Sequence, residues 1–276
     1  MQTTIVNGVR LAYERIGAGT PVVLVGGTGM PPAAWTLSGL VEKLVLARNE
    51  VVTYAARGVA PSEAPPPPYT VQEMADDLAG LLDSLALSDC VVVGYSLGGF
   101  VVEFLARTRP DLVRKAVLMA SAGPLTATLR ATLETEAALI TECGYLPAAF
   151  AKLEALRTSL PPRVLRDDPE QVDTWWQLLD AQHACWNSPA GECGQAAAAF
   201  NWTHDADRME QLCEIRQPTL VVCFEEDLYF PPWAAQATVE RLPQGRLVEI
   251  AGAAHGGLMT HSDMCIDVLM PFITNA

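Results

Sequence analysis

The stretch that decides the fold is Val91-Val92-Val93-Gly94-Tyr95-Ser96-Leu97-Gly98-Gly99-Phe100. Its first residues are β-branched and apolar, which predicts a strand buried on both faces. The residues that follow carry apolar side chains at helical spacing up to about Arg109, and Pro110 ends that helix. A serine between such a strand and such a helix, in the pattern G-x-S-x-G, stands on a sharp turn above a sheet.

The residues on either side of Ser96 indicate why the turn is possible. Glycine occupies positions 94 and 98 because the turn brings backbone close to backbone. Ser96 would also sit at a helix N-terminus, whose positive end favours a developing oxyanion. The alternative is a glycine-rich turn with an incidental serine, since the motif alone is common. The flanking strand and helix favour Ser96 as a nucleophile.

Other apolar runs on either side of this stretch predict the rest of a sheet. Residues 3–16 alternate apolar and polar side chains around Asn7-Gly8, which is typical of an antiparallel hairpin. Short buried strands are predicted at residues 21–25, 51–54, 115–120, 219–223 and 246–250. A helix is predicted over 71–85, where Thr70 and Glu73 form a capping-box pattern. This alternation of strands and helices predicts an α/β protein with a mostly parallel sheet.

The alternation stops between about residues 125 and 216, where the sequence is helical in character and contains no buried strand. We interpret this part as a helical cap inserted between two core strands. The expected organisation is a first core segment over 1–124, the cap over 125–216 and a second core segment over 217–276.

A serine hydroxyl needs a base, and the base needs an orienting acid. Of the four histidines, His255 follows the last predicted strand in a loop of small residues, which favours it over His261. His183 and His204 fall in the predicted cap, where a solvated or packed role is expected. The acid is expected in the loop after the preceding strand, where Asp227 precedes a proline by four positions. Its neighbours at 225 and 226 are glutamates, expected to be solvated or supporting.

With these residues in place, the chain resembles the α/β-hydrolase superfamily over nearly its whole length. The matching features are residues 94–99, Asp227 with Pro231, and residues 252–255. The order serine, acid, histidine along the chain also agrees with that superfamily. The resemblance implies an eight-stranded α/β-hydrolase fold flanked by helices. It also implies an oxyanion hole made by the backbone N–H groups of Thr28 and Leu97.

Two stretches depart from the superfamily's usual patterns. Gly26 stands where a histidine often precedes glycine in the oxyanion loop. Residues 55–60 read Ala-Ala-Arg-Gly-Val-Ala, which keeps the Arg-Gly of a common D-x-R-G-x-G pattern but lacks its aspartate and a glycine. Both departures argue against the commonest esterase and perhydrolase subfamilies and leave the predicted triad unaffected.

Composition narrows the range of partners. The 276 residues carry a formal charge of −14 and show no basic stripe, so neither nucleic acid nor an anionic membrane is an expected partner. The seven scattered cysteines, with no CxxC and no recognisable leader, indicate free thiols and a cytoplasmic location. No cofactor pattern occurs, and the cysteines and histidines of the cap lack the spacing of a metal site.

The expected substrate is a small molecule with a largely apolar acyl group, bound in a pocket roofed by Trp176, Trp186 or Trp202. Packing between cap and core is the other role open to these tryptophans, and the sequence slightly favours it. The leading functional hypothesis is an esterase or thioesterase that works through an acyl-Ser96 intermediate. One alternative is a biosynthetic acyltransferase, loaded from a coenzyme A or acyl-carrier-protein thioester. Another is a ligand receptor that catalyses nothing.

Overall fold

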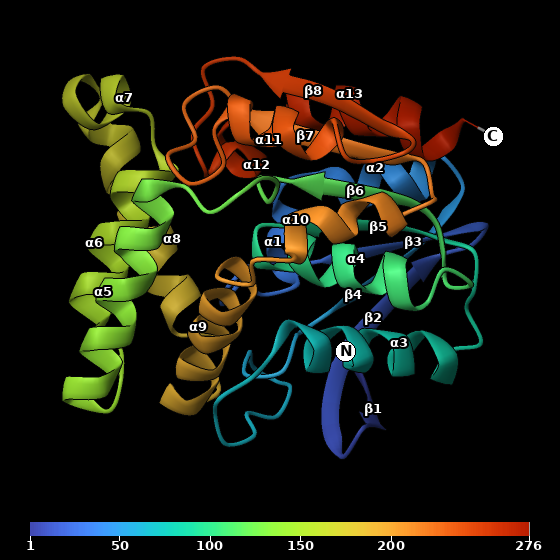
Figure 1. Ribbon diagram of the computed structural model, residues 1–276, viewed down its shortest axis with the longest axis horizontal. Helices are drawn as coiled ribbons and strands as arrows, with labels where there is room; N and C mark the ends of the chain where they lie inside the picture. The colour runs from blue at the N-terminus through green and yellow to red at the C-terminus, as the bar shows by residue number, and fades with distance from the viewer. Residues whose placement is uncertain (276) are drawn as a thin grey trace.

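The computed structural model describes residues 1–275 and contains the predicted eight-stranded sheet (Figure 1). The strands are β1 (Gln2–Val6), β2 (Val9–Gly17), β3 (Thr20–Val25), β4 (Asn49–Tyr54), β5 (Cys90–Tyr95), β6 (Val113–Met119), β7 (Thr219–Phe224) and β8 (Gly245–Ile250). Their order in the sheet is β1-β2-β4-β3-β5-β6-β7-β8. β2 is antiparallel to β1 and β4, and the strands from β4 to β8 are mutually parallel. The parallel strands therefore end at one edge of the sheet, where their loops can meet.

Helices cover both faces of this sheet. One face packs against α3 (Val71–Ser84), α4 (Leu97–Thr108) and α11 (Pro232–Val239). The other packs against α1 (Ala33–Leu37), α2 (Leu40–Leu46), α12 (Gly257–Thr260) and α13 (Ser262–Thr274). Successive strand residues alternate between the two layers: Val92 joins the first core cluster, while Val91 and Val93 join the second. Burial on both faces explains why these strands are continuous apolar runs.

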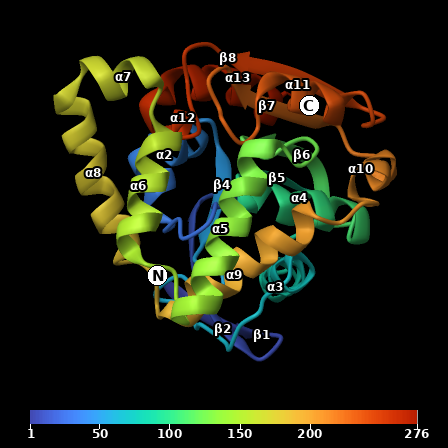
Figure 2. The ribbon, with the colours of Figure 1, turned by 60° about the vertical axis from the view of Figure 1, so that its left-hand side comes forward.

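The segment between β6 and β7 is a helical insertion. It contains α5 (Ala127–Cys143), α6 (Ala148–Ser159), α7 (Pro162–Asp167), α8 (Pro169–His183), α9 (Pro189–Thr203), α10 (Arg208–Gln211) and the 3-10 helix η1 (Leu212–Glu214). In Figures 1 and 2, α5 to α8 stand together at one end of the sheet, and α9 leads back toward the core. α5 packs against α9, and α6 packs against α8.

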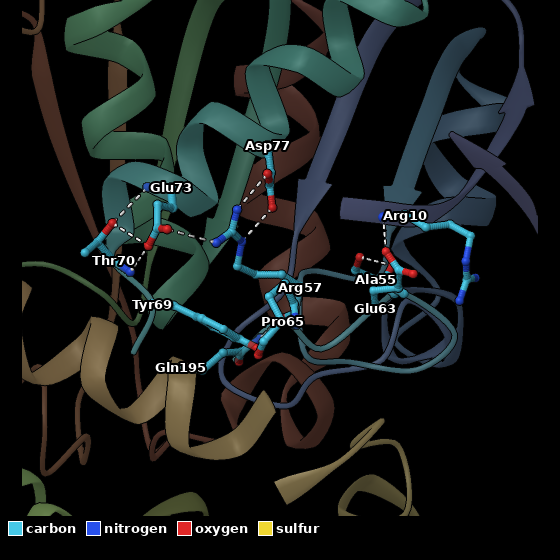
Figure 3. A network of polar contacts seen from close by, with 11 residues as sticks. Arg10, Ala55, Arg57, Glu63, Pro65, Tyr69, Thr70, Glu73, Asp77 and Gln195 are labelled. Carbon is cyan, nitrogen blue, oxygen red and sulfur yellow. Dashed lines mark hydrogen bonds and ion pairs between the residues drawn. The ribbon is translucent and has the colours of Figure 1, made fainter. Parts of the chain in front are cut away.

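The insertion is joined to the core beside the loop after β4. Figure 3 shows Arg57 of that loop with its guanidinium aimed at Asp77 of α3, at 2.7 and 2.9 Å. The backbone carbonyl of Arg57 accepts a hydrogen bond from Gln195 of α9, at 2.8 Å. Thr70 and Glu73 form the predicted capping box at the start of α3, in the same view. Among residues 1–275, no helix combines the length and apolarity needed to cross a membrane.

Candidate active site

Ser96 lies on the turn between β5 and α4. Its backbone has φ 52° and ψ −123°, a strained conformation for a residue with a side chain. A Cβ at position 94 would meet the Gly98 carbonyl carbon at 2.6 Å, and one at position 98 would meet the Gly26 oxygen at 2.6 Å. Only glycine fits at these two positions, so the two flanking glycines are what allow the serine to stand on this turn.

The structure brings Ser96, His255 and Asp227 into one hydrogen-bonded line. His255 Nε2 lies 3.1 Å from Ser96 Oγ, and His255 Nδ1 lies 2.8 Å from Asp227 Oδ2. The other oxygen of Asp227 accepts hydrogen bonds from the backbone N–H groups of Tyr229 and Phe230, at 2.8 and 3.1 Å. The three side chains come from the loops after β5, β8 and β7, which end at the same edge of the sheet. A hydroxyl, an imidazole and a buried carboxylate in this order can form an activated nucleophile.

The competing acids and bases lie elsewhere. Glu225 accepts a hydrogen bond from the backbone N–H of Gly252 at 2.7 Å, and Glu226 pairs with Arg163 at 3.5 Å. His261 contacts Thr260 through Nδ1 at 2.8 Å, and His204 stacks on the ring of Phe200. Within residues 1–275, neither of these two histidines forms a hydrogen bond with Ser96.

The surroundings of His255 set its protonation. Burial lowers its pKa, but the charge and hydrogen bond of Asp227, with the charge of Glu154, more than offset this and raise the pKa above its ordinary value. The rings of Tyr95, Tyr229 and Phe230 lie 5.2 to 5.8 Å from the imidazole, centroid to centroid. The Tyr95 hydroxyl also donates a hydrogen bond to the His255 carbonyl. These contacts restrict the imidazole to one orientation.

Thr28 and Leu97 both border the cavity beside Ser96. Within residues 1–275, neither backbone N–H has a hydrogen-bond partner, so both are available to an oxygen atom. Their loops are close together, since a Cβ at Gly27 would lie 3.1 Å from Ser96 Cβ. Gln195, fully buried, holds the loop from the other side by accepting a hydrogen bond from the Gly29 N–H at 3.0 Å. A carbonyl oxygen placed here would meet two donors.

A cavity of about 280 Å³ extends from Ser96 between the sheet edge and the helical insertion. Its lining is mainly apolar and includes Trp186, but neither Trp176 nor Trp202. Trp176 is instead 37% exposed with Lys152 over its ring, and Trp202 packs edge-on against Phe104. Neither of these two tryptophans lines the cavity, and Trp202 has the alternative role of packing between the insertion and the core.

The positions of four residues near Ser96 could not be predicted from the sequence. Trp175, not Trp176, is the member of that adjacent pair that lines the cavity. Gln195 and Glu154 lie in the insertion, far from every motif, and nothing in their spacing indicates their position. Tyr95 stands inside the motif, but its partner is a backbone carbonyl 160 residues away. Among residues 1–275, no group of three or more His, Cys, Asp or Glu is arranged to hold a metal ion.

Known proteins resemble this chain over its whole length. A putative non-heme bromoperoxidase, BpoC, of Mycobacterium tuberculosis is 27% identical over 267 residues, covering 97% of this chain and 98% of that one. Its crystal structure superposes with a TM-score of 0.86, covering 100% and 99% of the two chains. A putative carbamate hydrolase, RutD, of Azorhizobium caulinodans is 27% identical, covering 95% and 94%.

An esterase and a family model complete the comparison. A thermophilic esterase from Thermogutta terrifontis is 26% identical with a TM-score of 0.81, covering 99% and 98% of the two chains. Residues 22–268 match the model of the alpha/beta hydrolase family, a range that includes Ser96, Asp227 and His255. The chain therefore belongs to the alpha/beta hydrolase family and is an enzyme of that class.

Proposed function

We propose that this enzyme hydrolyses an ester or thioester of a small, largely apolar acyl group through an acyl-Ser96 intermediate. The observation that carries the proposal is the line of hydrogen bonds from Ser96 through His255 to Asp227. The mainly apolar cavity of about 280 Å³ supports a small acyl group. The likeness to an esterase of the same fold supports ester chemistry.

The reaction follows from the positions of these groups. Ser96 Oγ attacks the carbonyl carbon while His255 Nε2 takes the hydroxyl proton, and Asp227 stabilises the imidazolium that forms. The N–H groups of Thr28 and Leu97 bind the oxyanion of the tetrahedral intermediate. His255 returns the proton to the leaving alcohol or thiol, and a water molecule then releases the acid by the same route. The helical insertion serves as the cap of this site.

Intact-mass analysis after mixing with a short-chain p-nitrophenyl ester tests the proposal. The wild-type protein gains the mass of the acyl group and loses it again on turnover, while Ser96→Ala gains nothing. His255→Ala slows acylation by about a thousandfold or more, because triad members act as a unit. His261→Ala is the matched control and retains the wild-type rate.

Two outcomes would contradict the proposal. An adduct that persists in Ser96→Ala would show that another residue is the nucleophile. Failure to detect an adduct with any ester or thioester would rule out an acyl-enzyme intermediate. Adding an alcohol, amine or thiol acceptor separates hydrolysis from transfer, since an acyltransferase releases its acyl group faster with the acceptor than in water alone.

A further inference from the structure

Three glutamates of the helical insertion line the cavity that starts at Ser96. They are Glu136 of α5, Glu154 of α6 and Glu192 of α9. Glu192 is 7% exposed, and Glu154 has a fully buried Oε1 with no hydrogen-bond partner. Three carboxyl groups from three different helices thus point into a mainly apolar space.

The cations beside this space do not neutralise the glutamates. Within residues 1–275, neither Glu136 nor Glu154 forms an ion pair, and the ion pair of Glu192 is with His183, at 3.9 Å. Lys152 also borders the cavity, but its ammonium is paired with Asp180 and lies 3.8 Å from the centroid of the Trp176 ring. Within the part of the chain that the structure describes, the three acidic groups therefore have one ion-pair partner among them, the imidazole of His183.

The glutamates also influence one another and the proposed catalytic histidine. Burial raises the pKa of Glu136 to about 8, and the charges of Glu154 and Glu192 add to that rise. Burial raises the pKa of Glu154 to about 7 against the charge of His255, and that of Glu192 to about 7 against a hydrogen bond from Trp186. The three therefore form a connected acidic wall that reaches from His255 to Glu192.

These carboxyl groups lower the stability of the fold unless a cation or a hydrogen-bond donor binds to them. An ionised carboxyl group that is buried without a cation or hydrogen-bond donor is unfavourable, and ionised neighbours add repulsion. A second polar group is also unpaired: Trp175, which is 9% exposed and lines the same cavity, has a buried Nε1–H without a partner. Groups left unpaired at a binding site indicate partners that the ligand brings.

We propose that the substrate carries a positively charged nitrogen, and that Glu136 and Glu192 bind it while the reacting carbonyl lies at Ser96. The substrate class is therefore a cationic ester or thioester, such as an ammonium- or trimethylammonium-bearing acyl compound. Glu154, between this charge and His255, completes the acidic wall. Any proton held by a glutamate is released to solvent when the cation binds. The inference rests on the proposed function for the identity of the reacting group.

Two p-nitrophenyl esters of equal shape test the inference. One carries γ-trimethylammoniobutyrate, and the other replaces its nitrogen by a quaternary carbon and is neutral. The wild-type enzyme turns over the cationic ester with the higher kcat/KM, by about tenfold or more, as expected for one partly buried charge pair. Glu136→Gln reduces this ratio by about tenfold. Glu134→Gln, which removes an exposed carboxylate from the same helix, leaves the ratio unchanged.

A binding measurement tests the preference for a cation independently of the acylation of Ser96. Isothermal titration of Ser96→Ala with pentylammonium and with pentanol reports the preference for charge without any reaction. Equal kcat/KM for the two esters, or equal binding of the two ligands, overturns the cation inference even when Ser96 is acylated. If neither ester acylates Ser96 but pentylammonium binds selectively, and Glu136→Gln abolishes that selectivity, the proposed function fails and the cation site stands.

Discussion

At the scale of single residues, the site depends on side chains whose neighbours hold them in one orientation. Asp227 is 3% exposed and accepts two backbone hydrogen bonds through one oxygen, which leaves the other for His255. This arrangement orients the carboxylate toward Nδ1 of the imidazole and so fixes which imidazole nitrogen faces Ser96. The proposed base is therefore neutral when Ser96 attacks, and it becomes charged only as the proton arrives.

The pH profile of acylation reports this arrangement. Because the pKa of His255 is raised and only neutral imidazole accepts the proton, kcat/KM rises with pH through a midpoint above about 6.5. Asp227→Asn lowers that midpoint and slows acylation by about ten-thousandfold, since the imidazolium loses its counter-charge. Initial rates from about pH 5 to about pH 9, the range in which histidine titrates, measure both effects. A midpoint below that of free histidine would contradict the assignment.

At this scale the sequence predicts what is local. Ser96 and its flanking glycines lie within one motif, and His255 and Asp227 follow predicted strands at a shared sheet edge. Glu136, Glu154 and Glu192 escape prediction because their meeting depends on how three helices pack. Trp175 and Trp176 show the same limit, since helical periodicity predicts that they face apart but not which of them faces the cavity.

At the scale of elements, the helical insertion is tied to the oxyanion loop by Gln195 of α9. Its amide accepts a hydrogen bond from Gly29 and donates one to the carbonyl of Arg57, so one buried side chain joins the loops after β3 and β4. Close backbone approach supports the same junction, because a Cβ at Gly58 would meet Gly191 Cα at 2.8 Å. The position of Thr28 therefore depends on a helix about 170 residues further along the chain.

Replacing Gln195 by methionine isolates this connection. Gln195→Met keeps the length of the side chain but leaves the Gly29 N–H and the Arg57 carbonyl buried and unpaired, at a cost of about 1 to 3 kcal/mol each. We expect the free energy of unfolding to fall accordingly, and kcat to fall by about tenfold with a smaller change in KM, because the oxyanion donor shifts. Urea unfolding and steady-state kinetics measure the two.

The matched control is Gln236→Met, which replaces an exposed glutamine. We expect this variant to have the free energy of unfolding and the kcat of the wild type. If Gln195→Met loses stability but keeps kcat, Gln195 supports the fold and does not position the oxyanion loop. The strands and α3 could be foreseen from apolar runs and a capping box, whereas this junction could not, because a buried glutamine carries no periodic signal.

At the scale of the whole molecule, one buried ion pair anchors the end of the insertion to the core. Arg208 of α10 donates hydrogen bonds to both oxygens of Glu103 on α4, at 3.1 and 2.9 Å, and to the Gly123 carbonyl at 2.8 Å. Both side chains are at most 2% exposed. Arg208 therefore joins the segment that follows β6 to the segment that precedes β7, and holds both against α4.

Breaking this anchor destabilises the whole fold. Arg208→Met leaves the Glu103 carboxylate uncompensated in the interior, which costs about 3 to 5 kcal/mol. The double variant Arg208→Met with Glu103→Leu recovers most of that loss, because no buried charge remains. Thermal unfolding of both variants measures the difference. Equal destabilisation of the single and double variants would show that packing, not charge, makes the contact important.

The acidic wall of the cavity has a consequence for how this enzyme would change under laboratory evolution. The raised pKa of Glu136 means that the stability it allows at low pH is lost as pH rises toward about 8, where the carboxyl group ionises. A library selected only for heat resistance at neutral pH would therefore be enriched in neutral replacements at this position. Such selection would yield more thermostable proteins that no longer distinguish a cationic substrate from its neutral isostere.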